Sequence, residues 1–288
     1  MRVWWAQGTR EAMIAFFEGD DPRFEELALA GLSGAVAALP EDPKLRTLLG
    51  EAQAEGGLVA EAVGTLRAAV ETESGRKDYL PWDMLGVALH LDGHSQEAEA
   101  AFGRALALAP GHATGWAKLG STLMRQAPPR NAEAAACYRR AVDGVAAAGG
   151  APDARLLYNL GSLHMRLSQS EEAAAMFSAA IAAEPTHVKA MGNLASLRNA
   201  AGRFAEGIAL LETALGLEGR QGRLPADLAV ALGATHEQAH AALPNSSPQA
   251  LEEARAAYRQ ALASHPSHAA AAAKLEALEA RIGHGAEL

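Results

Sequence analysis

The chain has 288 residues, of which 49% are apolar and 5% aromatic, and its formal charge at pH 7 is −9. This apolar content is ample for a sizeable core, and the acidic balance argues against a protein that binds nucleic acid through a basic surface. The single cysteine, Cys137, rules out a disulfide within the chain, and the sequence lacks a run of about 18 apolar residues that would predict a membrane-spanning helix.

The N-terminal segment has no continuous apolar stretch of the kind found in secretory signals, because polar residues such as Gln7 and Glu11 interrupt it. We therefore expect a cytoplasmic protein. Trp4 and Trp5 precede the first regular element. Two interpretations of them stay open: a cap over the first helices, or an aromatic contact with a partner protein, since aromatic side chains often anchor interfaces.

A recurrent pattern of large and small residues runs along the chain and is clearest in the stretch that begins at Tyr79. With Tyr79 as position 1, large apolar residues fall at positions 4, 7, 11 and 24, small ones at 8, 20 and 27, glycine at 15 and proline at 32. The residues at these positions are Trp82, Leu85, Gly86, Leu89, Gly93, Ala98, Phe102, Ala105 and Pro110. The pattern resembles the tetratricopeptide repeat, a unit of about 34 residues that forms two helices joined by a turn.

Seven copies of the pattern follow one another in chain order. They cover residues 9–42, 43–76, 79–112, 113–148, 154–187, 188–221 and 226–268. The first copy is degenerate, and the fourth and seventh contain insertions near Pro128 and within residues 243–250. Residues 269–283 follow as a further helix that would cover the last exposed face, as terminal repeats do in such proteins.

The spacing has a physical logic. Each copy predicts two amphipathic helices, here called helix A and helix B, which can bury their apolar faces only against neighbours. Small residues at positions 8 and 20 let the two helices touch, glycine at 15 supplies the turn, and proline at 32 ends helix B. The sequence therefore predicts an all-α fold: an α–α superhelix of about seven helix pairs plus a C-terminal capping helix, forming one domain over residues 1–288.

The resemblance implies that the A helices line a concave groove, with positions 2, 5, 6, 9, 12 and 13 facing a bound peptide. The A helices expected at 113–126, 154–168 and 188–201 carry Lys and Arg but neither Asp nor Glu. The candidate groove residues are Lys118, Arg125, Arg155, Arg166 and Lys189, together with Asn159 and Asn193 at position 6 of their repeats. Cations attract carboxylates, and asparagine amides can pair with a peptide backbone. The alternative is that these cations are solvated surface charges without a partner.

These features predict a non-catalytic scaffold or adaptor that binds an extended, acidic segment of a partner protein and needs no cofactor. One alternative is a structural subunit of a larger assembly that contacts its partners through the convex face or the ends. The identity of the partner and the oligomeric state do not follow from the sequence, because one fold serves many functions.

Residues 236–240 spell His-Glu-x-x-His. On a helix His236 and His240 share one face and could bind zinc, with the glutamate as general base, as in metallopeptidases. Glu252 or Glu253 of the next helix would be the third ligand. This motif supports a second alternative, a zinc metallopeptidase. The competing interpretation is an ordinary repeat helix without a metal, because His236 falls at position 11, which is a buried seam position of the repeat.

Overall fold

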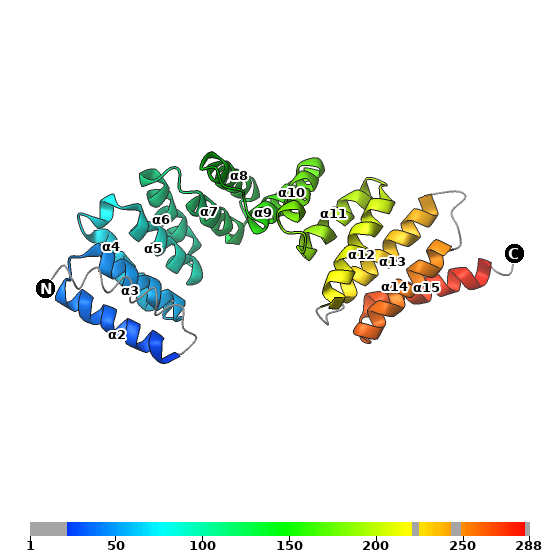
Figure 1. Cartoon of the computed structure of the whole chain (residues 1–288), viewed down its shortest axis with the longest axis horizontal. Helices are drawn as coiled ribbons and strands as arrows, with labels where there is room; N and C mark the ends of the chain where they lie inside the picture. The colour runs from blue at the N-terminus through cyan, green and yellow to red at the C-terminus, as the bar shows by residue number, and fades with distance from the viewer. Residues whose placement is uncertain (1–21, 221–224, 243–248, 286–288) are drawn as a thin grey trace. The chain divides into compact units, whose positions relative to one another are not determined.

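The computed structural model describes residues 22–220, 225–242 and 249–285. Within these ranges the regular structure consists of fourteen α-helices and one short 3-10 helix, with no strand (Figure 1). Consecutive helices form antiparallel pairs, which confirms the predicted all-α class and the order of helices A and B. Trp4, Trp5 and the first part of the first predicted repeat, residues 9–21, lie outside the described residues.

The described chain divides into two compact parts, one that ends at Gly150 and one that begins at Ala151. We call them the N-terminal body and the C-terminal body and describe each by itself. The boundary falls in the connector between the fourth and fifth predicted repeats. A single continuous superhelix over residues 1–288 stays a prediction.

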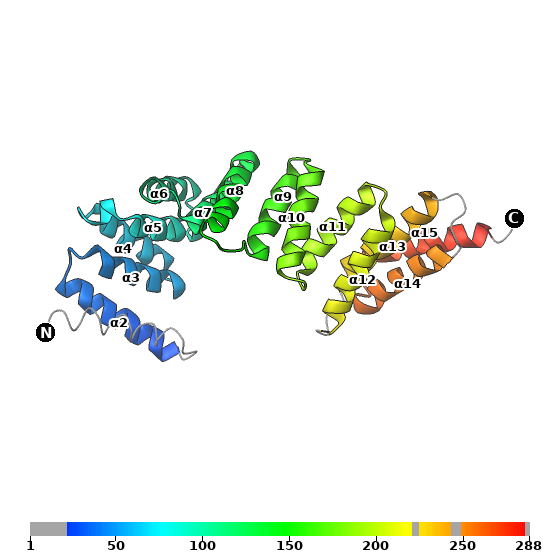
Figure 2. The ribbon, with the colours of Figure 1, turned by 45° about the horizontal axis from the view of Figure 1, so that its top comes forward.

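Within the described residues, the N-terminal body contains helix α2 followed by three helix pairs. Its elements are α2 (Pro22–Ala38), α3 (Pro43–Glu55), α4 (Val59–Glu71), η1 (Gly75–Lys77), α5 (Tyr79–Leu91), α6 (Ser95–Leu108), α7 (Ala113–Arg125) and α8 (Asn131–Ala147). The A helices are α3, α5 and α7, and each packs against the B helix that follows it (Figure 2). The A helices also contact one another, α3 with α5 and α5 with α7.

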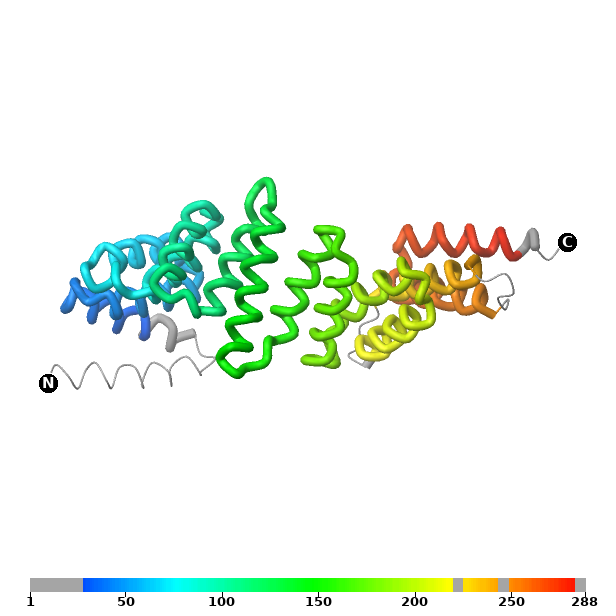
Figure 3. The backbone as a smooth tube through the Cα atoms, turned by 90° about the horizontal axis from the view of Figure 1, so that it is seen from above, coloured from blue at the N-terminus to red at the C-terminus, as the bar shows by residue number. Residues whose placement is uncertain are grey.

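The C-terminal body contains three further pairs and a last helix. Its elements are α9 (Ala154–Arg166), α10 (Ser170–Ala183), α11 (Val188–Ala200), α12 (Phe204–Arg220), α13 (Ala226–Ala242), α14 (Gln249–Ser264) and α15 (Ala269–Gly285). The last helix, α15, lies alongside α14 and also touches α13 (Figure 3). Its apolar residue Leu278 is fully buried, so α15 covers the final pair as the sequence predicts.

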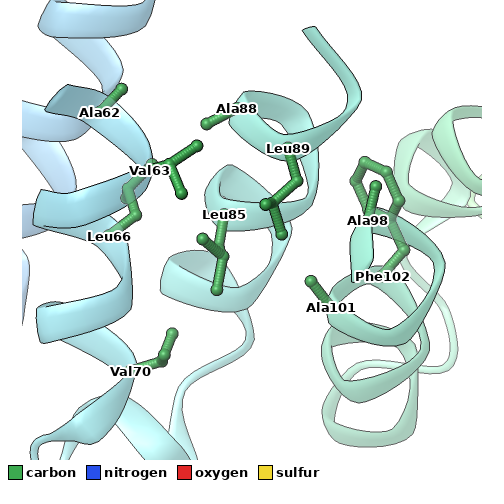
Figure 4. Packing of buried hydrophobic residues seen from close by; sticks show 10 residues of the cluster. All are labelled: Ala62, Val63, Leu66, Val70, Leu85, Ala88, Leu89, Ala98, Ala101 and Phe102. Carbon is green, nitrogen blue, oxygen red and sulfur yellow. The ribbon is translucent and has the colours of Figure 1, made fainter. Parts of the chain in front are cut away.

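The small residue at position 8 lets an aromatic ring from helix B lie flat across helix A. A Cβ atom added at Gly86 would come within 2.7 Å of the Phe102 ring, and one added at Gly161 within 2.9 Å of the Phe177 ring. Both rings are buried. Around Phe102 the core continues through α4, α5 and α6, where Leu66, Leu85 and other aliphatic side chains interdigitate (Figure 4).

Helix ends follow the same register. Asp42, Asp78 and Asp153 cap the N-termini of α3, α5 and α9 by accepting backbone N–H bonds. At position 15 the turn between helices A and B requires a positive φ, which Gly93 adopts at 85°. In the α9–α10 turn the same position is held by Ser168, at a φ of 59°.

Candidate functional site

The seven candidate groove residues lie on three A helices. Lys118 and Arg125 are on α7 of the N-terminal body, whereas Arg155, Asn159 and Arg166 on α9 and Lys189 and Asn193 on α11 belong to the C-terminal body. Because the two bodies are described separately, the candidates form two surfaces rather than one, and each is built below from its own contacts.

The C-terminal candidates repeat in register. Arg155 and Lys189 occupy position 2 of their helices, and Asn159 and Asn193 follow one turn later at position 6. Arg155 and Lys189 are exposed, and neither makes an ion pair or a hydrogen bond with another described residue. We call these four residues the basic–amide row. Arg166, at the end of α9, is likewise exposed.

The two cations of this row stand at an unfavourable place for helix stability. The N-terminus of a helix carries a partial positive charge, so a cation in the first turn is disfavoured by roughly 0.3–1 kcal/mol. Neither α9 nor α11 has an acidic residue in its first turn. Helix stability therefore does not explain why Arg155 and Lys189 stand there.

An aromatic contact joins the two helices of the row. The ring of Tyr158 on α9 lies 5.0 Å from the ring of His187 and 5.8 Å from that of Phe177, measured between centroids. His187 caps α11, since its Nδ1 accepts a bond from the N–H of Ala190 at 3.2 Å. Tyr158 thus links the first half of α9 to the start of α11. Sequence reasoning missed this residue, although position 5 is one of the inward-facing positions.

In the N-terminal body, Lys118 is committed to a carboxylate of the preceding A helix. Its Nζ donates to Oδ2 of Asp83 at 2.6 Å, and Nε2 of His112 lies 3.6 Å from the same oxygen. The Asp83 side chain is 1% exposed and that of Lys118 is 35% exposed. Lys118 therefore neutralises a buried acid, and its part in a peptide-binding groove stays a prediction. Its partner Asp83 lies one A helix earlier, outside the three A helices that lack acids.

Arg125 is exposed, and its guanidinium donates to the carbonyl oxygen of His90 at 3.0 Å. Partial burial, followed by the charge of Arg125, lowers the pKa of His90. The His90 ring also meets the hydroxyl of Thr122, with Nδ1 3.0 Å from Oγ1. Because that hydroxyl donates to the carbonyl of Lys118, the contact requires the proton on Nδ1 of His90.

A similar hydrogen bond, from a side chain of one A helix to a threonine hydroxyl of the next, recurs in the C-terminal body. Nδ2 of Asn199 donates to Oγ1 of Thr235 at 2.6 Å, and Thr235 donates to the carbonyl of Ala231. In both bodies a side chain at position 12 meets a fully buried threonine at position 10 of the next A helix. These pairs connect successive repeats, and the pattern of apolar residues contained no signal for them.

The His-Glu-x-x-His segment lies on α13 and is occupied by contacts within the body. His236 is buried, and its Nδ1 lies 3.2 Å from Oε2 of Glu253 on α14. Glu237, the residue that would act as general base, accepts bonds from the hydroxyl of Tyr258 at 2.5 Å and from Arg281 at 2.7 Å. Burial and then Glu237 raise the pKa of Tyr258 well above its usual value. Glu237 thereby connects α13, α14 and α15.

His240 is half-buried and makes a contact of its own within the chain. Over the residues that the structure describes, no three His, Cys, Asp or Glu side chains are grouped so that they could hold a metal ion. The geometry of the motif is thus that of helix packing. None of the helices in the described ranges combines the length and the apolar character needed to cross a bilayer.

Helix pairs that repeat in one register define a helical repeat protein, and in four of the described pairs a glycine of helix A faces an aromatic ring of helix B. A profile of the tetratricopeptide repeat family matches residues 26–78, 91–152 and 158–223. The chain belongs to the tetratricopeptide repeat family, whose members generally serve as scaffolds for protein–protein interaction and are typically non-catalytic. No curated protein sequence matches it.

Among the solved structures that share the fold are the following three. The C-terminal part of a repeat protein from Cytophaga hutchinsonii is 13% identical with a TM-score of 0.71, and the match covers 93% of this chain and 99% of that one. YrrB, described as a repeat protein with an unusual peptide-binding site, is 18% identical with a TM-score of 0.60, over 73% and 97%. PilF of Pseudomonas aeruginosa is 16% identical with a TM-score of 0.59, over 83% and 97%. At these identities the likeness concerns the fold alone.

Proposed function

We propose that the chain is a non-catalytic scaffold whose C-terminal body binds an extended, acidic segment of a partner protein through the basic–amide row. The observation that carries the proposal is the pair Arg155 and Lys189: two exposed cations at one repeat position, with no ion pair to a described residue, in a chain of net charge −9. Their place at helix N-termini gives them no structural benefit, which favours a role in binding.

Each residue type in the row has a distinct task in this proposal. Arg155 and Lys189 attract carboxylates and raise the rate of encounter with an acidic segment. An asparagine amide carries two donor hydrogens and an acceptor oxygen, so Asn193, and Asn159 beside the contact that it already makes within the chain, suit the backbone of an extended chain. Arg166 adds a further cation at the end of α9. Arg125 and Lys118 belong to the N-terminal body and are not part of this row, and Lys118 neutralises Asp83 there. YrrB provides a precedent for a peptide-binding member of this fold.

The test is binding of labelled acidic peptides to the full-length protein, followed by fluorescence anisotropy. We expect the double variant Arg155→Glu/Lys189→Glu to weaken binding at least about tenfold, because two attractive contacts become repulsive. Lys274→Glu is the matched control, since Lys274 is an exposed cation on α15 of the same body. Unchanged binding in the double variant, or a preference for basic peptides, would refute the proposal. A stoichiometric complex that survives charge reversal would instead favour the structural-subunit alternative.

A further inference from the structure

One helix of the N-terminal body presents an apolar row on its exposed face. Leu80, Met84, Val87 and Leu91 on α5 are spaced i, i+4, i+7 and i+11, so they share one side of the helix. Leu80 is 42% exposed and Leu91 is 53% exposed, and Met84 and Val87 between them are half-buried. We call these four residues the apolar row.

The helix that carries this row has no charged side chain on its exposed side. The one Asp, Glu, Lys or Arg of α5 is Asp83, which is buried and paired with Lys118. A helix that is apolar around its whole circumference normally lies inside a protein. One face of α5 packs on the core cluster with Leu85 and Leu89. Met84 and Val87 also pack partly against this cluster, and Leu80 and Leu91 at the two ends of the row are its exposed members.

Charges of opposite sign stand on the two neighbouring A helices. Glu51 and Glu55 on α3 occupy positions 9 and 13, as Val87 and Leu91 do on α5, and both are exposed. On the other side of α5, Arg125 of α7 occupies position 13. The helices α3 and α7 both lie next to α5. The apolar row therefore has the two glutamates of α3 on one side and Arg125 of α7 on the other.

The α3 edge has a cation at position 2, Lys44, which lies two turns before Glu51. Partial burial and the neighbouring charge of Glu55 raise the pKa of Glu51, while the charge of Lys118 lowers it to a smaller extent. Neither Glu51 nor Glu55 makes an ion pair with a described residue. A cation from a partner would relieve the repulsion between these two carboxylates.

We infer that the apolar row binds a short segment of a partner protein that carries large apolar side chains next to a lysine or arginine, with that cation seated against Glu51 and Glu55. The row spans about 16 Å along α5, which matches about five residues of an extended segment. The inference rests on the scaffold role proposed above but uses other residues and a partner of opposite charge. The two proposals can therefore fail separately.

The experiment measures the affinity of the full-length protein for peptides with two leucines flanked by lysine, by serine or by glutamate. We expect the lysine-flanked peptide to bind best and Leu91→Glu to weaken it by about tenfold, since an apolar contact is lost. Leu108→Glu is the matched control, because Leu108 is a comparably exposed leucine at the end of α6. The double variant Arg155→Glu/Lys189→Glu should leave this binding unchanged.

Charge reversal tests the two glutamates of α3 independently of apolar packing. In Glu51→Lys/Glu55→Lys, both changed side chains are exposed, and the preference should shift from the lysine-flanked to the glutamate-flanked peptide. Equal affinity for all three peptides, or no effect of Leu91→Glu, would overturn the inference. It would also be overturned by self-association that Leu91→Glu abolishes, or by a peptide of residues 1–17 that binds better than the partner peptides, because the occupant would then be this chain itself.

Discussion

The A helices of the two bodies share one repeat register yet carry different chemistry on their exposed faces. Position 2 is Leu80 on α5 but Arg155 on α9, and position 13 is Leu91 on α5 but Arg166 on α9. The buried positions do not diverge in this way, since both repeats place glycine at position 8 against a phenylalanine ring. Packing therefore constrains the residues at the buried positions of the repeat. The residues at the exposed positions are free to vary, and with them the chemistry of the surface.

Cations on the two bodies also differ in what they neutralise. Lys118 in the N-terminal body lies 2.6 Å from a buried carboxylate, whereas Lys189 in the C-terminal body has no carboxylate partner among the described residues. We therefore expect Lys118 to contribute to stability and propose that Lys189 contributes to binding. Four predictions, in order of decreasing effect, test this difference and the common framework beneath it.

Removal of Asp83 should have the largest effect. Asp83→Ala leaves Lys118 partly buried without its counter-charge, and breaking such a pair costs about 2–3 kcal/mol of unfolding free energy, allowing for the exposure of Lys118. Asp143→Ala, which changes an exposed acid on α8, should cost less than about 0.5 kcal/mol. Urea unfolding measures both. Equal stability of the two variants would show that the Asp83–Lys118 pair contributes nothing.

Because both bodies are packed alike, a larger residue at position 8 should lower the free energy of unfolding by a similar amount in each. Gly86→Ala and Gly161→Ala place a methyl group within 3 Å of an aromatic ring, and overpacking of this kind costs about 1–3 kcal/mol. Gly103→Ala on α6 meets no atom within 4 Å and should stabilise the helix by about 0.5–1 kcal/mol. Thermal or urea unfolding gives the three values. A loss in only one body would mean that the repeats are not packed alike.

Charge reversal in the basic–amide row should separate binding from stability. Arg155→Glu and Lys189→Glu each place an anion in the first helical turn and should raise the unfolding free energy by about 0.3–1 kcal/mol while acidic peptides bind less well. Lys118→Glu in the N-terminal body should instead destabilise, because it sets a second acid beside Asp83. If all three variants lose stability, the contrast between the bodies is wrong.

The smallest expected effect is the contribution of His90, in the N-terminal body, to the pH dependence of the free energy of unfolding. The pKa of His90 is lowered from 6.5 in the folded protein, so the unfolded chain binds the proton more readily. The resulting stability is present above pH 6.5 and is lost as the pH falls through the folded pKa. Comparison of urea midpoints near pH 7.5 and pH 5.5 should show a smaller decrease for His90→Asn than for the wild type. His265→Gln, on an exposed turn, is the control and should behave like the wild type.

Much of the fold was predictable because its signal is local. The spacing seen in Trp82, Leu85 and Gly86 recurs from one repeat to the next. The residues that form turns and caps lie directly beside the helices that they end or begin. The capping helix was predicted at 269–283 and found at Ala269–Gly285. The two surfaces proposed for binding were less accessible to prediction. The absence of acids on their own helices indicated Arg155 and Lys189 as candidates, but it gave no signal for the apolar row on α5, because apolar residues in a repeat are expected to be buried.

By itself the sequence determined the class of helix, the register of the pairs and which side chains occupy each repeat position, since these depend on periods of a few residues. Only the tertiary structure decided how polar side chains pair across repeats: Lys118 with Asp83, and Glu237 with Tyr258 and Arg281. These partners are 21 to 44 residues apart. Helical periodicity indicates which face a side chain occupies but not which residue of the next helix it meets, because that depends on how the helices are packed.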